Sequence, residues 1–184
     1  MTLDLRFAAL LLLLLLPACG SLYEPASAPS GRGLAYALGA AEGPPRIVPV
    51  KAPLQCVPFA RQLSGIEIRG DAWSWWDSAA GRYARGGRPQ PGAVMVFSAT
   101  RRVPLGHLAV VTRVLGPREV LVRHANWLNG GRIHLDTPVR DVSPGNDWSA
   151  VRVWYTPGQT LGARTYALSG FILPPRSGTL ISQS

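Results

Sequence analysis

The sequence is poor in the side chains that most often carry chemistry. Its 184 residues include two cysteines, three histidines and a single lysine, Lys51. Two cysteines are too few for the disulfide framework that stabilises many small exported domains. No internal repeat is present, and no motif of a nucleic-acid-binding module accompanies the dispersed arginines, so no nucleic-acid partner is expected.

Acidic residues are also scarce, with 10 against 19 basic residues, which gives a formal net charge of +9. A positive protein suits work beside anionic polymers or lipid head groups. A genome composition that favours arginine codons explains the same excess equally well. The charge is therefore compatible with an envelope protein without identifying one.

The N-terminus has the layout of an export signal. Arg6 precedes an unbroken leucine run from Leu10 to Leu16, which is shorter than the roughly 20 residues that a membrane-spanning helix needs. The following "LPAC" resembles a bacterial lipoprotein signal, in which Cys19 would receive a lipid. An ordinary cleaved signal with an incidental Cys19 is the alternative. Both predict export, and the first predicts a membrane-anchored lipoprotein of the cell envelope or periplasm.

Composition divides the chain into four parts. Residues 1–18 are the expected signal peptide, and residues 19–48, rich in Ala, Gly, Pro and Ser, read as a flexible linker. Residues 49–175 are long enough for one domain with its own core. Residues 176–184 form a C-terminal tail.

Helical patterns come before strand patterns in this domain. A helix is expected from Val57 to Leu63, with Pro58 tolerated in its first turn, and a second from Asp71 to Gly81. Strands are expected from His107 to Leu115 and from Val120 to Trp127, joined by a hairpin-like turn. This order predicts an α+β fold, with N-terminal helices packed on an antiparallel sheet.

The phase of the second helix predicts which of its tryptophans are buried. Ala72, Trp76 and Ala80 share one stripe at helical spacing. Trp75 then faces away from the stripe and is expected to be exposed.

Cys56 stands at the start of the first predicted helix, where unpaired N–H groups and the helix dipole stabilise a thiolate. A nearby imidazole would activate the thiol further. Three other interpretations remain open: a buried structural thiol, a disulfide with Cys19, and a zinc site with His107 and His124.

The histidines supply the partner that a nucleophilic Cys56 needs. His107 opens a strand directly after Gly106, and alternation places His124 and Asn126 on one face of the next strand. Asn126 could then accept the ring N–H of a histidine on the neighbouring strand and fix its tautomer. Cysteine, histidine and an amide in these roles form the geometry of a papain-like thiol hydrolase. His134 reads as a structural strand residue.

Five stretches in order resemble the CHAP domain of cysteine, histidine-dependent amidohydrolases and peptidases: "QCVPFAR", "GDAWSWWDSA", "PQPGAVMVF", "GHLAVVTRV" and "VRHANW". The resemblance extends over roughly residues 54–155. It implies a papain-like fold, Cys56 as nucleophile and His107 as general base, with no cofactor. Many members carry an acidic residue two positions before an asparagine. Here His124 takes the acidic position, which favours Asn126 as the third residue and His124 as an auxiliary one.

The resemblance also implies a reaction and a substrate. Cys56 would attack an amide of peptidoglycan, either between muramic acid and the first alanine or within the stem peptide, through a thioester. The Cys56 backbone N–H and Gln55 are candidates for the oxyanion donors. A catalytically inactive CHAP-like module that binds the wall or a partner is one alternative, and a thiol hydrolase of a non-wall amide is the other. A regulatory protein partner fits an activity that endangers its own cell.

Overall fold

The computed structural model describes residues 43–127 and 130–175, all of which belong to one compact unit, Gly31–Ser184. The predicted signal peptide, Cys19 and the C-terminal tail lie outside the described residues. No helix within the described part of the chain combines the length and the apolar character needed to cross a membrane.

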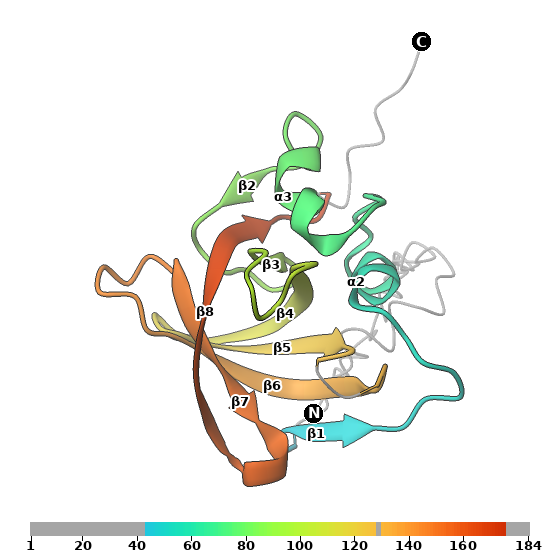
Figure 1. Ribbon diagram of the computed structural model, residues 1–184. Helices are drawn as coiled ribbons and strands as arrows, with labels where there is room; N and C mark the ends of the chain where they lie inside the picture. Colours follow the sequence, from blue (N-terminus) through green and yellow to red (C-terminus); the bar gives the residue numbers. More distant parts are fainter. Residues whose placement is uncertain (1–42, 128–129, 176–184) are drawn as a thin grey trace, which may run out of the picture. The chain divides into compact units, whose positions relative to one another are not determined.

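Six antiparallel strands close into a barrel (Figure 1). They are β3 (Val94–Phe97), β4 (His107–Gly116), β5 (Glu119–Ala125), β6 (Ile133–Asp141), β7 (Ala150–Tyr155) and β8 (Thr160–Ile172). The ring closes because β7 pairs with both β6 and β8. Two short strands extend the sheet outside the ring: β1 (Arg46–Val48) pairs with β6, and β2 (Arg85–Gly86) pairs with β8. Closure leaves the six barrel strands with partners on both sides.

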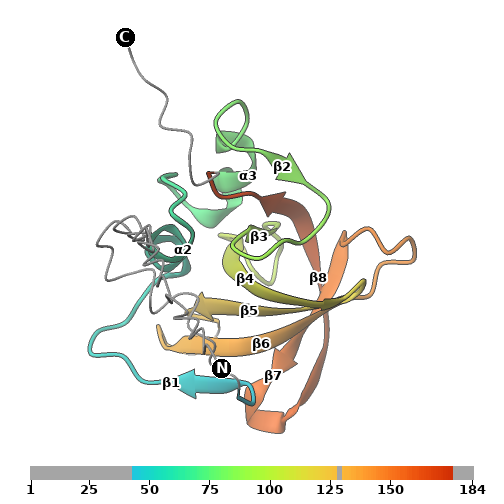
Figure 2. The same ribbon diagram turned by 180° about the vertical axis from the view of Figure 1, so that it is seen from behind.

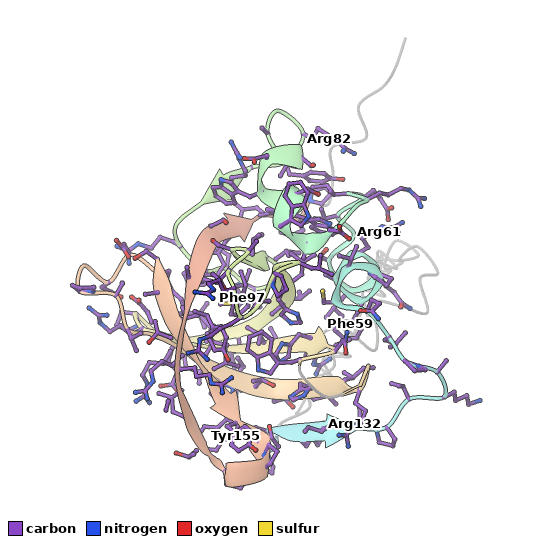
Figure 3. All side chains as sticks on the ribbon, viewed as in Figure 1. Phe59, Arg61, Arg82, Phe97, Arg132 and Tyr155 are labelled. Carbon is purple, nitrogen blue, oxygen red and sulfur yellow. The ribbon has the colours of Figure 1, made fainter. Side chains whose placement is uncertain are left out.

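The barrel interior is one apolar core. The strand sequences are rich in valine and other β-formers, and alternate side chains point inward. Figure 3 shows Phe97 inside the ring of strands. The fully buried side chains of this core include Met95, Phe97, Val111, Val122 and Phe171. Burial of each such side chain contributes roughly 1.5–3 kcal/mol, so the interior stabilises the strand ends that carry the site.

A second core lies between the barrel and the helices. The helices are α2 (Cys56–Ser64), η1 (Ala72–Ser74) and α3 (Trp75–Ser78), and a further short 3₁₀ turn, η2 (Thr156–Gly158), joins β7 to β8. Figures 1 and 2 show α2 and α3 on one side of the barrel, next to β3 and β4. The outward side chains of these two strands, Val94 and Val96 on β3 and Leu108 and Val110 on β4, pack in this second core with buried residues of the helical segment. All four residues of β3 are therefore buried.

The helix and strand predictions are confirmed in their main features. Helix α2 covers the predicted segment and ends at Gly65, whose φ of 72° forms the left-handed cap. The predicted hairpin is β4 and β5, although β5 ends at Ala125 rather than Trp127. The α+β class is met only in part, because strands dominate and the sheet closes on itself. Closure depends on long-range pairing, which local periodicity does not encode.

Two local predictions are wrong. The segment predicted as one helix from Asp71 to Gly81 is a 3₁₀ turn followed by a single α-turn. This change of period rotates the side chains, so Trp75 is fully buried and Trp73 is 54% exposed. The linker prediction also extends too far, since Arg46–Val48 is the strand β1.

Candidate active site

Strand direction gathers the site at one end of the barrel. In an antiparallel ring, the end of β3, the start of β4, the end of β5 and the start of β6 meet at the same rim. His107 is the first residue of β4, His124 is the last but one of β5, and His134 is the second of β6. All three histidines are buried there, at 4% exposure or less. The three histidines of the sequence therefore form one cluster.

Cys56 reaches this rim from outside the barrel, as the first residue of α2. Its side chain is half-buried. Burial raises the pKa of the Cys56 thiol, while hydrogen bonds from the backbone of Leu108, Val57 and Cys56 itself lower it. Burial is the larger effect, so the resting form at neutral pH is the thiol. The start of α2 favours the thiolate once it forms, through its unpaired N–H groups.

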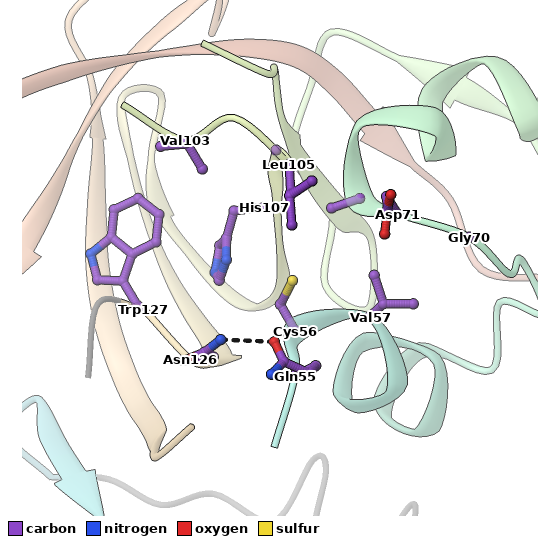
Figure 4. A pocket seen from close by; sticks show the side chains of 12 residues that line it. Gln55, Cys56, Val57, Gly70, Asp71, Val103, Leu105, His107, Asn126 and Trp127 are labelled. Atoms are coloured by element: carbon purple, nitrogen blue, oxygen red, sulfur yellow. Dashed lines mark hydrogen bonds between the residues drawn. The ribbon is translucent and has the colours of Figure 1, made fainter. Parts of the chain in front are cut away.

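Cys56 and His107 line one pocket of about 440 Å³ (Figure 4). One wall is the start of α2, and the other is the barrel rim with His107, Asn126 and Trp127. Leu105, 61% exposed, lies on the rim of this pocket, which also includes Asp71. A pocket that brings a thiol and an imidazole together beside an open rim can hold an acyl group for transfer.

Gly106 allows the chain to enter β4 at this point. Its φ is +67°, and a Cβ added there would lie 2.9 Å from the Phe97 carbonyl oxygen and 2.9 Å from the Trp73 backbone nitrogen. From the sequence, we expect this small residue to leave the His107 ring accessible. The structure gives it a different role, because only glycine fits both the left-handed backbone and the close approach of two other segments.

His107 is held by a second histidine. Its Nε2 lies 3.0 Å from Nδ1 of His124, and its ring packs on Trp127 at a centroid distance of 4.7 Å. If Nε2 of His107 donates to Nδ1 of His124, then Nδ1 of His107 keeps a lone pair that can accept a proton. The opposite tautomer places a proton on His107 Nδ1 and removes the base. The direction of this single bond therefore decides whether His107 can act as a general base.

His124 is the residue that orients His107 in this geometry. It is fully buried, and its Nε2 has no hydrogen-bond partner among the described residues. The rings of Trp127 and His134 lie 5.5 Å and 5.0 Å from its own ring centre. These aromatic neighbours hold the ring in place. His134, expected to be a structural strand residue, lies in the cluster and packs against His124.

The expected contact between Asn126 and a histidine ring is wrong. The Asn126 side chain donates to Gln55 Oε1 at 2.8 Å and accepts from the Gly131 backbone N–H at 2.9 Å. Strand β5 ends at Ala125 and Asn126 has a φ of 61°, so the alternation behind the expectation stops one residue earlier. Asn126 ties the rim of the barrel to the start of α2. A catalytic role for it remains a prediction.

Gln55 is the N-cap residue of α2, and its side chain makes no cap hydrogen bond. Its Oε1 is occupied by Asn126 (Figure 4), which leaves its amide N–H groups as donors. The neighbouring Leu54 backbone N–H donates to the Gly131 carbonyl at 3.0 Å. Gly131 has no room for a Cβ, which would lie 2.7 Å from Pro53 Cα. This close packing sets the position of Cys56 relative to the barrel.

Burial keeps the histidine cluster neutral. It lowers the pKa of His107 to about 3, with a further contribution from the charge of His134. The pKa of His124 lies well below its ordinary value, again through burial first and then through His107 and His134. Burial and the Arg132 charge lower the pKa of His134 to about 4. At neutral pH the site thus pairs a thiol with a neutral imidazole, without a preformed ion pair.

No group of three or more His, Cys, Asp or Glu side chains within the described ranges, 43–127 and 130–175, has the arrangement to hold a metal ion. Among described residues, Cys56 is a free cysteine. The chemistry available from these side chains is nucleophilic attack by sulfur with proton transfer by an imidazole.

Comparison with known proteins gives a family match over part of the chain. A search of curated proteins found no match. The family model of the CHAP domain matches residues 48–126, which include Cys56, His107, His124 and Asn126. Domains of this family are usually hydrolases of the amidase or peptidase type that act on peptidoglycan, and a papain-like fold is compatible with the match. Residues 48–126 of this chain are thus similar to the CHAP domain family.

Proposed function

We propose that this chain is a cysteine-dependent hydrolase of amide bonds in peptidoglycan, with Cys56 as nucleophile and His107 as general base. One observation carries the proposal. Cys56 and His107 line the same pocket, and the Nε2 of His107 is engaged by His124, which leaves Nδ1 for proton transfer. The scissile bond is either the muramoyl–alanine amide or an amide of the stem peptide.

The first half of the reaction forms a thioester. His107 Nδ1 takes the Cys56 proton as the sulfur attacks the amide carbonyl carbon, and the carbonyl oxygen becomes an oxyanion. The Cys56 backbone N–H and the Gln55 amide are the proposed donors to that oxyanion. The tetrahedral intermediate then expels the amine, which receives the proton from His107.

The second half regenerates the enzyme. His107 takes a proton from water, and the hydroxyl group adds to the thioester carbonyl. Collapse of this intermediate releases the carboxylic acid and the Cys56 thiolate, which recovers its proton from His107. His124 keeps the His107 ring in one tautomer and orientation throughout, the role that a carboxylate or amide has in related triads.

A neutral orienting residue has an energetic consequence. A carboxylate would stabilise the imidazolium that forms at His107, whereas neutral His124 provides a hydrogen bond without a negative charge. Charge separation between Cys56 and His107 therefore occurs during the attack itself. The backbone donors at Cys56 favour the thiolate at that moment.

The deciding experiment is a digest of purified peptidoglycan by the full chain, followed by mass analysis of the soluble fragments. Cys56→Ala is expected to abolish the fragments, while Cys19→Ala, which removes the other cysteine, leaves them. The fragment masses would identify the bond. A folded wild-type protein that releases nothing would contradict wall hydrolysis, and turnover of a soluble amide instead would indicate a non-wall substrate.

A second candidate is an inactive CHAP-like module that binds the wall or a partner. Two observations favour it: His124 stands at the position that is acidic in many members, and burial raises the pKa of the Cys56 thiol. Turnover distinguishes the two. An inactive module predicts no fragments in the digest and no hydrolysis of a soluble amide by a folded protein. Slow alkylation of Cys56 by iodoacetamide, which a resting thiol also predicts for the hydrolase, would not decide between them.

The proposed location is the cell envelope. Export follows from the N-terminal signal pattern, and lipid on Cys19 would anchor the domain through the linker to a membrane. Such a tether would let the catalytic domain reach the wall. Radiolabelled palmitate incorporated into the wild-type protein and not into Cys19→Ala would support the anchor.

A further inference from the structure

A second pocket, of about 520 Å³, lies at the same end of the barrel, where β7 ends and β8 begins. Figure 3 shows Tyr155 at this turn. Four aromatic side chains line the pocket, namely Trp127, Trp154, Tyr155 and Tyr166. Arg164 is the one charged residue among its described lining residues, and none of them is acidic. The chemistry described above uses none of these side chains except Trp127, which packs on His107.

An irregularity in strand pairing builds this pocket. The register between β7 and β8 shifts between Arg152 and Trp154, with extra residues on β8. Arg152 Nε donates to the Gly162 carbonyl at 2.8 Å and holds this part of β8 in place. A Cβ on Gly162 would lie 2.7 Å from the Val153 carbonyl oxygen, so the close approach needs glycine. The pocket is therefore fixed by backbone contacts.

The pocket adjoins the cleft that holds Cys56. Trp127 lines both, and its ring packs on His107 at 4.7 Å on one side and on Tyr166 at 4.9 Å on another. A substrate with its reactive carbonyl at Cys56 can extend over Trp127 into the second pocket. The two pockets thus form neighbouring subsites at one rim.

We propose that the pocket between β7 and β8 binds a pyranose ring of the peptidoglycan glycan strand. A pyranose has an apolar C–H face, which an aromatic ring can cover, and a polar edge of hydroxyl and acetamido groups. Tyr155, 57% exposed, offers an accessible ring, and Arg164 offers hydrogen-bond donors to the polar edge. This assignment rests on the proposed wall hydrolysis and adds to it the part of the substrate that carries no scissile amide.

The aromatic faces that line the pocket suit a sugar ring. Peptides commonly bind by adding a strand to a free sheet edge, where the backbone supplies the hydrogen bonds. Among the described residues, β3 pairs with β8 only from Leu168 onward, so the outer edge of β8 is open beside this pocket. A peptide added to that edge is the competing occupant, which the sugar-free stem peptide below tests.

Binding of a soluble chitin tetrasaccharide to full-length Cys56→Ala protein tests the proposal without turnover. Tyr155→Ala in this background is expected to weaken binding about tenfold, and Arg164→Ala severalfold. Leu115→Ala, which removes an exposed apolar side chain of the β4–β5 hairpin, and Arg113→Ala are the matched controls, and both are expected to bind as the parent does. Circular dichroism confirms that each variant is folded.

The outcomes separate this proposal from the proposed function. Tetrasaccharide binding that depends on Tyr155 supports the subsite even if the wild-type protein releases no wall fragments. Wall digestion without measurable tetrasaccharide binding at millimolar concentration would overturn the subsite and leave the hydrolase standing. Tyr155-dependent binding of a sugar-free stem peptide, or equal loss in the control variants, would also overturn the assignment.

Discussion

The cleft has a helix wall, which is the start of α2, and a barrel wall, which is the rim with His107 and Trp127. Different kinds of contact position the catalytic side chains of these two walls. The helix wall presents Cys56 through local structure, at the start of α2 and within reach of backbone donors. The barrel wall presents His107 through long-range pairing, with His124 on the next strand and Trp127 packed on its ring. A partly exposed nucleophile therefore meets a base whose partner is completely enclosed.

The difference shows what burial does to a catalytic pair. Burial lowers the pKa of His107 and raises the pKa of Cys56, and both shifts favour the uncharged forms. Backbone donors counter this effect at Cys56, but neutral His124 adds no charge to counter it at His107. The helix wall thus stabilises the Cys56 thiolate better than the barrel wall stabilises the His107 imidazolium.

Removal of either catalytic side chain should have the largest effect. Cys56→Ala and His107→Ala are each expected to lower kcat/KM on peptidoglycan at least about a thousandfold, since nucleophile and base act as a unit. The double variant should be no worse than the more damaging single one. If the losses in kcat/KM of the two single variants multiply in the double variant, as measured by fragment release, Cys56 and His107 do not act as a unit.

Gly106→Ala should destabilise the folded protein, because it strains the backbone at the start of β4. The added Cβ meets two backbone segments at 2.9 Å in a left-handed conformation, so we expect a loss of about 3 kcal/mol in the free energy of unfolding, measured in urea. Gly116→Ala is the matched control, because nothing lies within 4 Å of its Cβ position and its φ is ordinary. Equal stability of the two variants would argue against the packing described for Gly106.

Acid should lower the free energy of unfolding through His107 on the barrel wall. The pKa of His107 is about 3 in the folded chain and about 6.5 in an unfolded one, so the unfolded state binds more protons between these values. Its contribution to stability is complete above about pH 6.5 and declines as the pH falls toward 3. At pH 5 the loss from His107 alone is about 2 kcal/mol. Unfolding in urea at pH 7 and pH 5 measures it, with His107→Asn expected to show a smaller decrease.

The smallest expected effect is the difference in kcat/KM between the His124→Ala and Asn126→Ala variants. His124→Ala removes the partner of His107, whereas Asn126→Ala releases a contact to Gln55, so we expect kcat/KM to fall about tenfold further in the first variant. His124→Asn, which keeps an acceptor, should recover part of the loss. Equal kcat/KM for His124→Ala and wild type, with both folded, would return the orienting role to Asn126.

Local patterns predicted much of this architecture. Helix α2, its glycine cap, and the hairpin of β4 and β5 follow from spacing and turn residues. Trp75 shows where such patterns fail, because its burial depends on a 3₁₀ turn whose period differs from the assumed one. The prediction that Asn126 contacts a histidine ring is wrong for a similar reason. Asn126 follows the end of β5 and has a left-handed backbone, so strand alternation no longer sets the direction of its side chain.

The sequence by itself determined the chemical parts: a cysteine at a helix start, a histidine after Gly106, and a histidine two residues before an asparagine. Only the tertiary structure decided which parts touch. Pairing of β4, β5 and β6 gathers three histidines at one rim and places His107 beside His124, and the shift between β7 and β8 opens a second pocket beside Trp127. The reason is physical: helix starts and turns are set by neighbours in the chain, whereas ring closure and register depend on contacts between distant residues.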